Sequence, residues 1–506
     1  MNTTAARHAV YAVPALWAGC AVFAALTAAV TTLPPHRVWG AFAACGYAAA
    51  ALASLAATRR ARRFRRFRRF RRTWRTRLSR CGPAPGAACR SGPPPLRRTP
   101  SPRCTPLTRT ATYLCCGSAA LVPLLVLAFT HSAQEEVHVV HRAAARLLAE
   151  GTPYQSPGRL AGADYAAYNP YLPGMAVFGV PHQLIGLDAR FCFAAVFLLT
   201  FALSLRIAGA RSVGRRTLLL TASPLIALPM AVGGDDLPVL GLVCLGLALG
   251  CPWPPSSGRS PARYAMSAGL VIGAACTLKA TAWPALAVAL ALLAARGGRL
   301  AVLRLLVGAA PPLAAGLVLP ALADGPGLMA NAVRFPLGMA EAASPAASPL
   351  PGTLLAGLGP AGHLCAVAAL VLAALLTAAS LLLRPPRDAS RAALRLALGL
   401  LLAMALLPAS RFGHAVHPAV LALWAHWRTL DARRENRPDT RPDTRRDESA
   451  GPTPAGRSGA GQPSRTPPGT AVSPTGPHAD RDERLPAAPG RHRDVRPRGR
   501  TPVPTR

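Results

Sequence analysis

The chain is 506 residues long, with 51% hydrophobic and 15% charged residues. This composition is too apolar for a soluble protein of that length built around ordinary cores, so it predicts an all-α, polytopic membrane protein. The net charge of +37 comes largely from 57 basic residues, of which Lys279 alone is a lysine. Much of this charge falls outside the apolar regions, in residues 59–110 and 431–506, and therefore says little about the membrane core.

Apolar runs recur along the chain at lengths that suit a bilayer. A membrane-crossing helix needs roughly 17 to 25 mostly apolar residues. Runs near this length lie at 10–32, 38–57, 112–130, 189–207, 217–232, 300–322, 361–383, 390–408 and 414–428, and shorter ones at 237–251, 264–278 and 280–295. Together they predict about 12 transmembrane helices.

Arginines indicate which side of the membrane each loop faces. Short cytoplasmic loops carry the excess of basic residues, and the stretch Arg59 to Arg80 holds thirteen arginines and no acid. With this stretch inside and twelve crossings, both termini are cytoplasmic, and nine of the ten acids before residue 431 fall outside. An acid-rich outer face suits an extracytoplasmic site, although acids could also simply collect where arginines are absent.

Composition divides the chain into four parts. We expect two N-terminal transmembrane helices in 1–58, an Arg/Pro-rich cytoplasmic loop in 59–110, a membrane core in 111–430 and a disordered cytoplasmic tail in 431–506. The loop repeats Arg-Arg-Phe three times. Such a run can grip nucleic acid, but beside a membrane helix we favour anionic lipids, at about 1 kcal/mol per Arg, and expect no nucleic acid.

Lys279 lies inside an apolar stretch that runs from Tyr264 to Leu293. An ionisable group at membrane depth is expensive and by default indicates a functional site. One continuous helix here would move the next arginines outside, so we expect two short helices broken near Lys279, as Trp283-Pro284 also favours. The alternative is a lysine at a helix end that reaches the headgroups and has no chemical role.

The longest predicted outer loop, residues 130–191, begins with acids and continues with tyrosines. Glu135 and Glu136 stand just beyond a predicted membrane helix, where a half-buried carboxylate can act as general base toward a hydroxyl. A short helix is expected at 137–150 and an interfacial segment at 172–187. The tyrosines could anchor the loop at headgroup level or stack on a sugar ring.

A second acidic pair, Asp235 and Asp236, follows Gly233-Gly234 at a predicted outer turn. These carboxylates could bind sugar hydroxyls, orient an acceptor or hold a divalent cation through oxygen ligands. Their alternative role is structural, because Asp is a favoured residue at helix N-caps. No metal site is predicted beyond this, since the sequence has no zinc-type spacing of paired Cys and His.

Several motifs in this order resemble a known family. The acidic outer loop is followed by Gly-Thr-Pro-Tyr at 151–154, Tyr-Asn-Pro-Tyr-Leu-Pro at 168–173, Gly-Gly-Asp-Asp-Leu-Pro at 233–238 and Leu-Lys-Ala-Thr-Ala-Trp-Pro at 278–284. Over about 111–430 the chain resembles bacterial membrane glycosyltransferases of the C-type superfamily. The nearest group is glycosyltransferase family 87, the polyprenyl-phosphate-mannose-dependent mannosyltransferases.

The resemblance implies an inverting transfer at the outer face of the bacterial plasma membrane. A sugar, mannose in this family, enters on a polyprenyl phosphate, and a hydroxyl of a glycolipid or glycan acceptor attacks its anomeric carbon. The family's catalytic base matches Glu136 or Glu135, with Glu136 preferred, although the family more often has Asp there. The first two helices precede the family's pattern and are interpreted as an N-terminal addition.

The chemistry of this reaction assigns roles to further residues. A departing phosphate needs positive charge aimed at it, which Lys279, Arg411 and His414 are predicted to supply near the outer face. The predicted substrate contacts are Asp164, Tyr168, Asn169, Tyr171, Asp235 and Asp236.

Two other classes of function stay open. A transporter or flippase of a lipid-linked envelope intermediate would be expected to show internal repeats and charged groups near the bilayer midplane, and the sequence shows neither a repeat nor midplane acids. A membrane scaffold would account for the basic loop and the tail, but gives no reason for the two acidic pairs and Lys279. We therefore rank the enzyme first, the transporter second and the scaffold third.

Overall fold

The computed structural model describes residues 3–78, 106–252, 262–342, 345–346 and 348–435, and every regular element within these ranges is helical. Among these described residues, seven helical stretches are long and apolar enough to cross a membrane. They are Ala12–Val30, Pro34–Arg63, Thr110–Phe129, Ala189–Ile207, Ala280–Ala323, Pro360–Leu383 and Ala389–Leu406. The predicted all-α, polytopic membrane class is confirmed, and the number of twelve crossings stays a prediction.

The N-terminal hairpin consists of α1 (Thr3–Val30) and α2 (Pro34–Leu78), which pack against each other. A third apolar stretch follows as α3 (Pro106–Cys115), η1 (Cys116–Leu121) and α4 (Val122–Phe129). Two buried aromatic side chains of α2 donate hydrogen bonds to backbone carbonyls of the core: Trp39 Nε1 to Ala119 O at 2.7 Å and Tyr47 Oη to Ala222 O at 2.7 Å. The hairpin is therefore fixed to the core by specific contacts.

The helix α2 continues past the predicted end of the second crossing. It runs without interruption to Leu78, so the first part of the segment predicted as a cytoplasmic loop is helical. At the other end, α19 (Val416–Glu435) extends a few residues into the predicted tail. Residues 79–105 and 436–506 lie outside the described residues, so lipid contact by the loop and disorder of the tail stay predictions.

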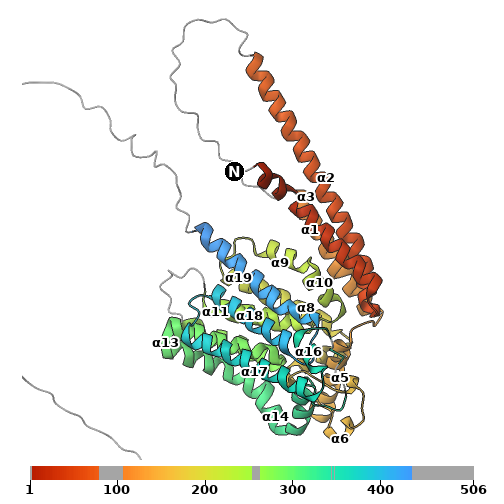
Figure 1. Ribbon diagram of the computed structural model, residues 1–506, viewed down its shortest axis with the longest axis vertical. Coiled ribbons are helices and arrows are strands. Elements are labelled where there is room, and N and C mark those ends of the chain that lie inside the picture. The colour runs from red at the N-terminus through yellow and green to blue at the C-terminus, as the bar shows by residue number, and fades with distance from the viewer. Residues whose placement is uncertain (1–2, 79–105, 253–261, 343–344, 347, 436–506) are drawn as a thin grey trace, which may run out of the picture. The chain divides into compact units, whose positions relative to one another are not determined.

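Short helices between α4 and α8 gather at one end of the long helices, with α5 and α6 close together (Figure 1). They are α5 (Glu135–Glu150), α6 (Pro157–Leu160), η2 (Tyr165–Ala167), η3 (Pro173–Gly179) and α7 (Val180–Ile185). The helix predicted at 137–150 is present, beginning two residues earlier. A second group of short elements comprises η5 (Ala314–Val318), α14 (Leu319–Ala323), α15 (Gly325–Leu328), η6 (Met329–Arg334) and α16 (Pro351–Ala356).

The remaining helices belong to the same compact unit, Met1–Pro438. They are α8 (Ala189–Ile207), α9 (Val213–Thr221), α10 (Pro224–Val232), α11 (Asp236–Gly250), α12 (Ala262–Leu278), η4 (Ala280–Ala282), α13 (Trp283–Leu313), α17 (Pro360–Leu383), α18 (Ala389–Leu406), η7 (Phe412–Ala415) and α19. The helix break predicted near Lys279 is present, because α12 ends at Leu278 and α13 begins at Trp283. Gly298, with φ of 62°, interrupts α13 and divides it into two segments.

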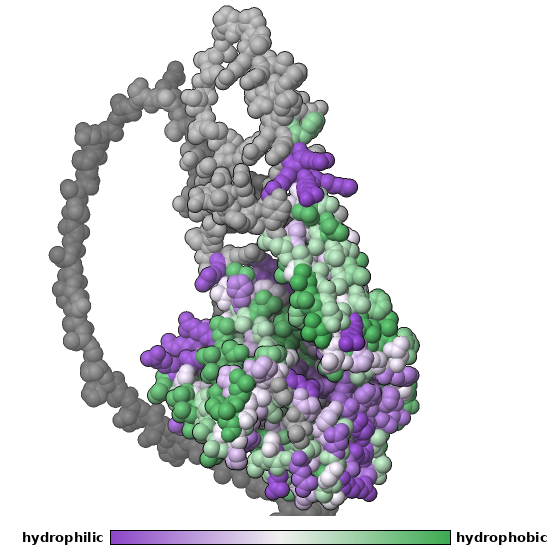
Figure 2. Space-filling model, turned by 45° about the vertical axis from the view of Figure 1, so that its right-hand side comes forward, coloured by the Kyte–Doolittle hydropathy of each residue, from purple (hydrophilic) through white to green (hydrophobic). Residues whose placement is uncertain are grey.

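Small residues set how closely α12 and α13 approach. A Cβ atom on Gly269 would collide with the backbone of Leu305, and one on Gly308 would collide with the backbone of Met266. Close backbone approach through small residues is the usual way that membrane helices associate. In the space-filling view, hydrophobic residues cover broad areas of the visible surface and hydrophilic ones gather in separate patches (Figure 2).

Candidate functional site

Glu136 lies in the first turn of α5 and forms an ion pair with a residue far along the chain. Its Oε1 accepts a hydrogen bond from Arg411 Nη1 at 2.6 Å. The Glu136 side chain is 22% exposed and that of Arg411 is 37% exposed. Burial raises the pKa of Glu136 above its ordinary value, and the Asp235 carboxylate raises it further, whereas Arg411 and Lys279 act in the opposite direction.

Lys279 lies between α12 and η4 in an extended backbone conformation that ends α12. Its Nζ is 2.5 Å from Asp235 Oδ2 and 2.5 Å from Asp236 Oδ1. The ammonium group also lies 4.9 Å from the centroid of the Tyr171 ring, within reach of a cation–π interaction. Only 13% of the lysine side chain is exposed. The break between the helices therefore delivers Lys279 to a buried site lined by two carboxylates.

The turn before α11 directs both aspartates toward that lysine. Gly234 adopts a φ of 85°, which a residue with a side chain rarely adopts. Asp235 occupies the N-cap position of α11, but its side chain makes no capping hydrogen bond. The structural role considered for this pair is therefore not seen at Asp235, and its carboxylate contacts Lys279 instead.

Two histidines near the start of α19 lie beside the cluster formed by Lys279, Asp235 and Asp236. His417 is 2% exposed, and its Nε2 lies 3.7 Å from Asp236 Oδ1. Its Nδ1 lies 3.3 Å from the backbone oxygen of His414. Burial lowers the pKa of His414, so this residue favours the neutral form over the charged one expected of a phosphate-binding group. His417 was not among the residues to which the sequence assigned a role.

Glu135 and Glu136 have different surroundings although they are adjacent in sequence. Glu135 forms an ion pair with Arg142 at 2.5 Å, and both side chains are 39% exposed. Arg142 also donates a hydrogen bond to Ala166 O at 2.7 Å, which ties the start of α5 to the loop at η2. Glu136 alone of the two contacts Arg411 and interacts electrostatically with Lys279 and Asp235.

The α1–α2 hairpin reaches the same loop, which the sequence did not predict. Gln134, directly before α5, has its Nε2 3.4 Å from His36 Nε2 at the start of α2. The Gln134 backbone N–H donates to Val232 O at 2.8 Å. A Cβ on Gly233 would come within 2.9 Å of Gln134 Oε1, so this side chain lies tightly against the glycine pair. No motif marked His36 or Gln134 in the sequence.

The other predicted substrate contacts divide into packed and exposed groups. Tyr168 is buried and stacks on Phe335 with ring centroids 4.5 Å apart. Asn169 is buried, its N–H donates to Asn331 Oδ1 at 2.9 Å, and its Oδ1 accepts from Tyr171 N at 3.2 Å. Both side chains hold the outer loop together. Asp164 caps η2 by accepting from Tyr165 N at 2.7 Å. Of this group, only Tyr171 reaches the cluster.

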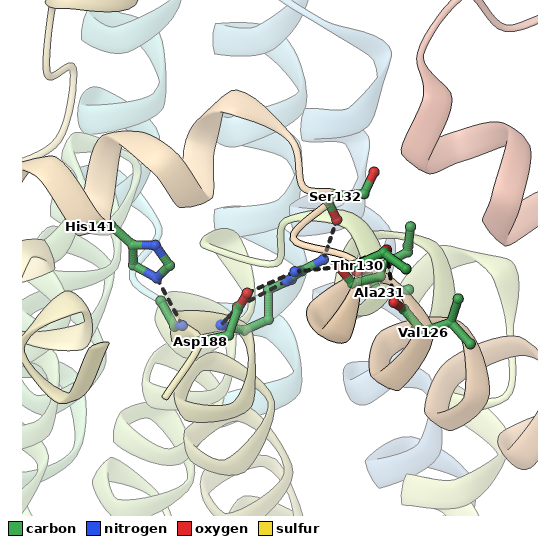
Figure 3. Close-up of polar contacts among 9 residues, drawn as sticks. Val126, Thr130, Ser132, His141, Asp188 and Ala231 are labelled. Atoms are coloured by element: carbon green, nitrogen blue, oxygen red, sulfur yellow. Dashed lines mark hydrogen bonds and ion pairs between the residues drawn. The ribbon is translucent and has the colours of Figure 1, made fainter. Parts of the chain in front are cut away.

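A second charged cluster fixes the neighbouring backbone. The Arg190 side chain is fully buried and pairs with Asp188 at 2.7 Å. Its guanidinium also donates to Ser132 O at 2.9 Å, Ala231 O at 3.0 Å and Leu127 O at 3.2 Å. Figure 3 shows Asp188, Ser132 and Ala231 converging on this point, with His141 beside the start of α8. His141 Nε2 accepts from Ala189 N at 3.2 Å, and burial beside His182 lowers its pKa to about 4.

The candidate site therefore brings three carboxylates and two cations together. Glu136, Asp235 and Asp236 face Lys279 and Arg411. Lys279 is matched by two carboxylates, whereas Arg411 holds one and stays partly exposed. Of the predicted phosphate-binding groups, Arg411 thus has the most capacity for a further anion. Within the described ranges, no group of three or more His, Cys, Asp or Glu side chains is placed to hold a metal ion.

Comparison with known proteins gives one structural likeness. No protein-family model matches the chain, and no curated protein sequence matches it either. Among solved structures it is similar to ArnT from Cupriavidus metallidurans in the apo state, at 19% identity and a TM-score of 0.38. The match covers 61% of this chain and 58% of that one, so the chain spans less than two thirds of that protein's length. The function is therefore argued from the geometry of the site.

Proposed function

We propose that the protein is an integral membrane glycosyltransferase that moves a sugar from a polyprenyl phosphate to an acceptor hydroxyl, with inversion at the anomeric carbon. The observation that carries the proposal is the position of Glu136. It is a half-buried carboxylate at the start of α5, bound to Arg411 at 2.6 Å and in electrostatic contact with Asp235 and Lys279. The reaction requires a base whose pKa is shifted by its surroundings and a nearby cation that a phosphate can reach, and Glu136 and Arg411 meet these two requirements.

In the proposed reaction Glu136 accepts the proton of the acceptor hydroxyl. The acceptor oxygen then forms a bond to the anomeric carbon while the bond from that carbon to the phosphate oxygen breaks, and the phosphate leaves with the electron pair. A base works best when its pKa lies near the working pH, and the raised pKa of Glu136 moves it in that direction. Attack opposite the leaving phosphate inverts the anomeric configuration.

Arg411 is the residue that we propose to bind the leaving phosphate. It is 37% exposed and holds Glu136 through one nitrogen. A donor phosphate could therefore bind the remaining guanidinium nitrogens, and the charge would be in place before the bond breaks. Lys279 has two carboxylate partners, so we propose that it orders Asp235 and Asp236 toward the sugar hydroxyls rather than binding the phosphate alone.

The finer assignments follow the family resemblance. We propose mannose as the sugar, a glycolipid or glycan as the acceptor, and the outer face of a bacterial plasma membrane as the location of the site. The charged groups stand at helix ends, since Asp236 begins α11 and Lys279 follows α12. Glu136 and Arg411 lie outside the candidate membrane spans found among the described residues, and this supports a site at one face of the membrane over a transporter site near the midplane.

The test is sugar transfer in membranes that contain the protein, supplied with labelled polyprenyl-phosphate mannose and extracted acceptors. We expect Glu136→Gln to lower the rate by about 10² to 10⁴, the usual contribution of a positioned base. Glu135→Gln is the matched control, because it removes an adjacent carboxylate that pairs with Arg142 instead. An equal loss of transfer rate in both variants would show that Glu136 is not the catalytic base. If the parent transfers none of several sugars, the transporter would be favoured instead.

A further inference from the structure

A basic cavity lies at the turn between α17 and α18. It has a volume of about 560 Å³, and its lining includes Arg384, Arg387, Arg391, Arg395, Leu383 and Leu394. Asp388, the acid of this turn, pairs with Arg391 at 3.2 Å and accepts from Arg391 N at 2.8 Å. Arg384 and Arg387 are exposed, and within the described ranges neither has an acidic partner. The turn therefore presents positive charge that the chain does not neutralise.

The turn is held in place by hydrogen bonds from neighbouring helices. Arg395 Nη1 donates to Ser380 O at 2.8 Å and lies 3.0 Å from Ser380 Oγ, which joins α18 to the end of α17. Arg296 Nη1 donates to Arg387 O at 2.9 Å, which joins the turn to the middle of α13. The cavity is thus built on packed helices, which fix the Arg395 side chain and the backbone of the turn that carries Arg384 and Arg387.

Two buried donors close to this turn lack partners. In the part of the chain that the structure describes, Arg296 Nε and Arg428 Nη1 are buried and make no hydrogen bond. Arg428 interacts electrostatically with both Arg296 and Asp388, which places the three groups in one neighbourhood. Neither residue lines the cavity, so the two guanidinium groups add positive charge behind the turn and offer no donors to a ligand in the cavity.

Apolar surface adjoins the basic turn. Leu382 and Leu383 at the end of α17 are 83% and 82% exposed, and Leu394 and Leu398 on α18 are 49% and 57% exposed. These helices are two of the candidate membrane spans, Pro360–Leu383 and Ala389–Leu406. A ligand that filled the cavity with an anionic group would have apolar surface directly beside it.

We propose that this cavity binds the phosphate headgroup of an anionic phospholipid, with its acyl chains along the exposed leucines of α17 and α18. A nucleic acid or a soluble anion would use the arginines but leave the leucines without a role. Basic pockets between membrane helices are typical sites for anionic headgroups. The site lies on different elements from the glycosyltransferase site, so either proposal can fail without the other.

The test is lipid binding to the purified full chain in detergent, measured by native mass spectrometry and by thermal unfolding. The probes are phosphatidylglycerol, phosphatidylcholine and inorganic phosphate. We expect phosphatidylglycerol to bind and stabilise the parent, and the double variant Arg384→Gln, Arg387→Gln to bind it about 30-fold more weakly, equivalent to about 1 kcal/mol per arginine. The double variant Arg384→Lys, Arg387→Lys keeps the charge and should retain most of the binding.

The matched control is Arg211→Gln, Arg215→Gln, which removes two exposed arginines near the α8–α9 turn. It should bind phosphatidylglycerol as the parent does. The proposal is overturned if the control loses as much affinity as the cavity variant, since binding would then follow total charge. It is also overturned if inorganic phosphate stabilises the parent as well as the lipid does, or if phosphatidylcholine binds equally. If the Gln variant unfolds, the proposal is tested by the Lys variant and by comparing phosphatidylglycerol with phosphatidylcholine and inorganic phosphate on the parent.

Discussion

Two arginine–carboxylate pairs lie at the same end of the helices and differ in how completely they are satisfied. The Arg190 side chain is 0% exposed, and its nitrogens are bound by Asp188 and three backbone carbonyls. The Arg411 side chain is 37% exposed and binds Glu136 through one nitrogen. The first pair is saturated and can only hold the backbone. The second retains donors for a ligand, and this difference separates a structural ion pair from a candidate catalytic one.

The largest expected effect on stability is at the saturated pair. Arg190→Ala would leave Asp188 without its cation and three backbone carbonyls without their donor, so we expect unfolding to become easier by about 3–5 kcal/mol. Thermal unfolding in detergent measures the change. Arg142→Ala is the control, because that arginine is 39% exposed and its ion pair with Glu135 should be worth at most about 1 kcal/mol. Similar losses in the two variants would contradict the comparison.

Lys279 provides an intermediate case that separates folding from function. Lys279→Met would leave two buried carboxylates without their cation, and we expect a loss of about 3 kcal/mol together with loss of sugar transfer. Adding Asp235→Asn and Asp236→Asn should recover much of the stability, because no uncompensated charge remains. Transfer should stay absent. Recovery of transfer in the triple variant would show that the cluster is structural only.

The pH dependence of transfer should shift in opposite directions at two neighbours of Glu136. The base is active when deprotonated, so the rate rises as pH rises through its raised pKa. Asp235→Asn removes a charge that raises this pKa, and the rising limb should move to lower pH. Arg411→Gln removes a charge that lowers it, and the limb should move to higher pH. Shifts in the same direction would exclude Glu136 as the titrating group.

The smallest effect is expected at Tyr168, which was predicted to contact substrate. Because its ring is buried and stacked on Phe335, Tyr168→Leu should cost about 1 kcal/mol in stability. We expect the KM for the acceptor to stay the same. A selective rise in that KM, with unchanged thermal unfolding, would support the predicted sugar contact instead of the packing role.

The sequence predicted features that depend on local pattern and helical length. The break at Lys279 and the helix after Glu136 follow from apolar runs, loop charges and a Trp-Pro pair, and both are present. The partners in the cluster could not be predicted, since Glu136 and Arg411 are 275 residues apart and Lys279 and Asp236 are 43 apart. Only tertiary packing decides that Lys279 is matched by two aspartates and that Tyr168 and Asn169 are turned into the loop.

His36 is the clearest example of a contact that the sequence could not predict. It belongs to a hairpin that was interpreted as an N-terminal addition, and its position beside Gln134 depends on how α2 packs against the core. The contacts of Trp39 and Tyr47 fix that packing, but neither carries a sequence signal beyond that of an aromatic residue in a membrane helix. Residues contributed by an added element therefore require the structure.

The last two residues of α10 hold the two chain segments that carry the acidic residues of the site. Ala231 O accepts from Arg190 and the next carbonyl, Val232 O, accepts from the Gln134 backbone. Glu136 lies two residues after Gln134, and Asp235 lies three residues after Val232. The distance between the proposed base and the carboxylates that face Lys279 is thus limited by the few residues that separate each of them from this hydrogen bond. Inserting a single alanine after Gln134 or after Val232 would shift one carboxylate relative to the other while leaving every charged residue in the chain.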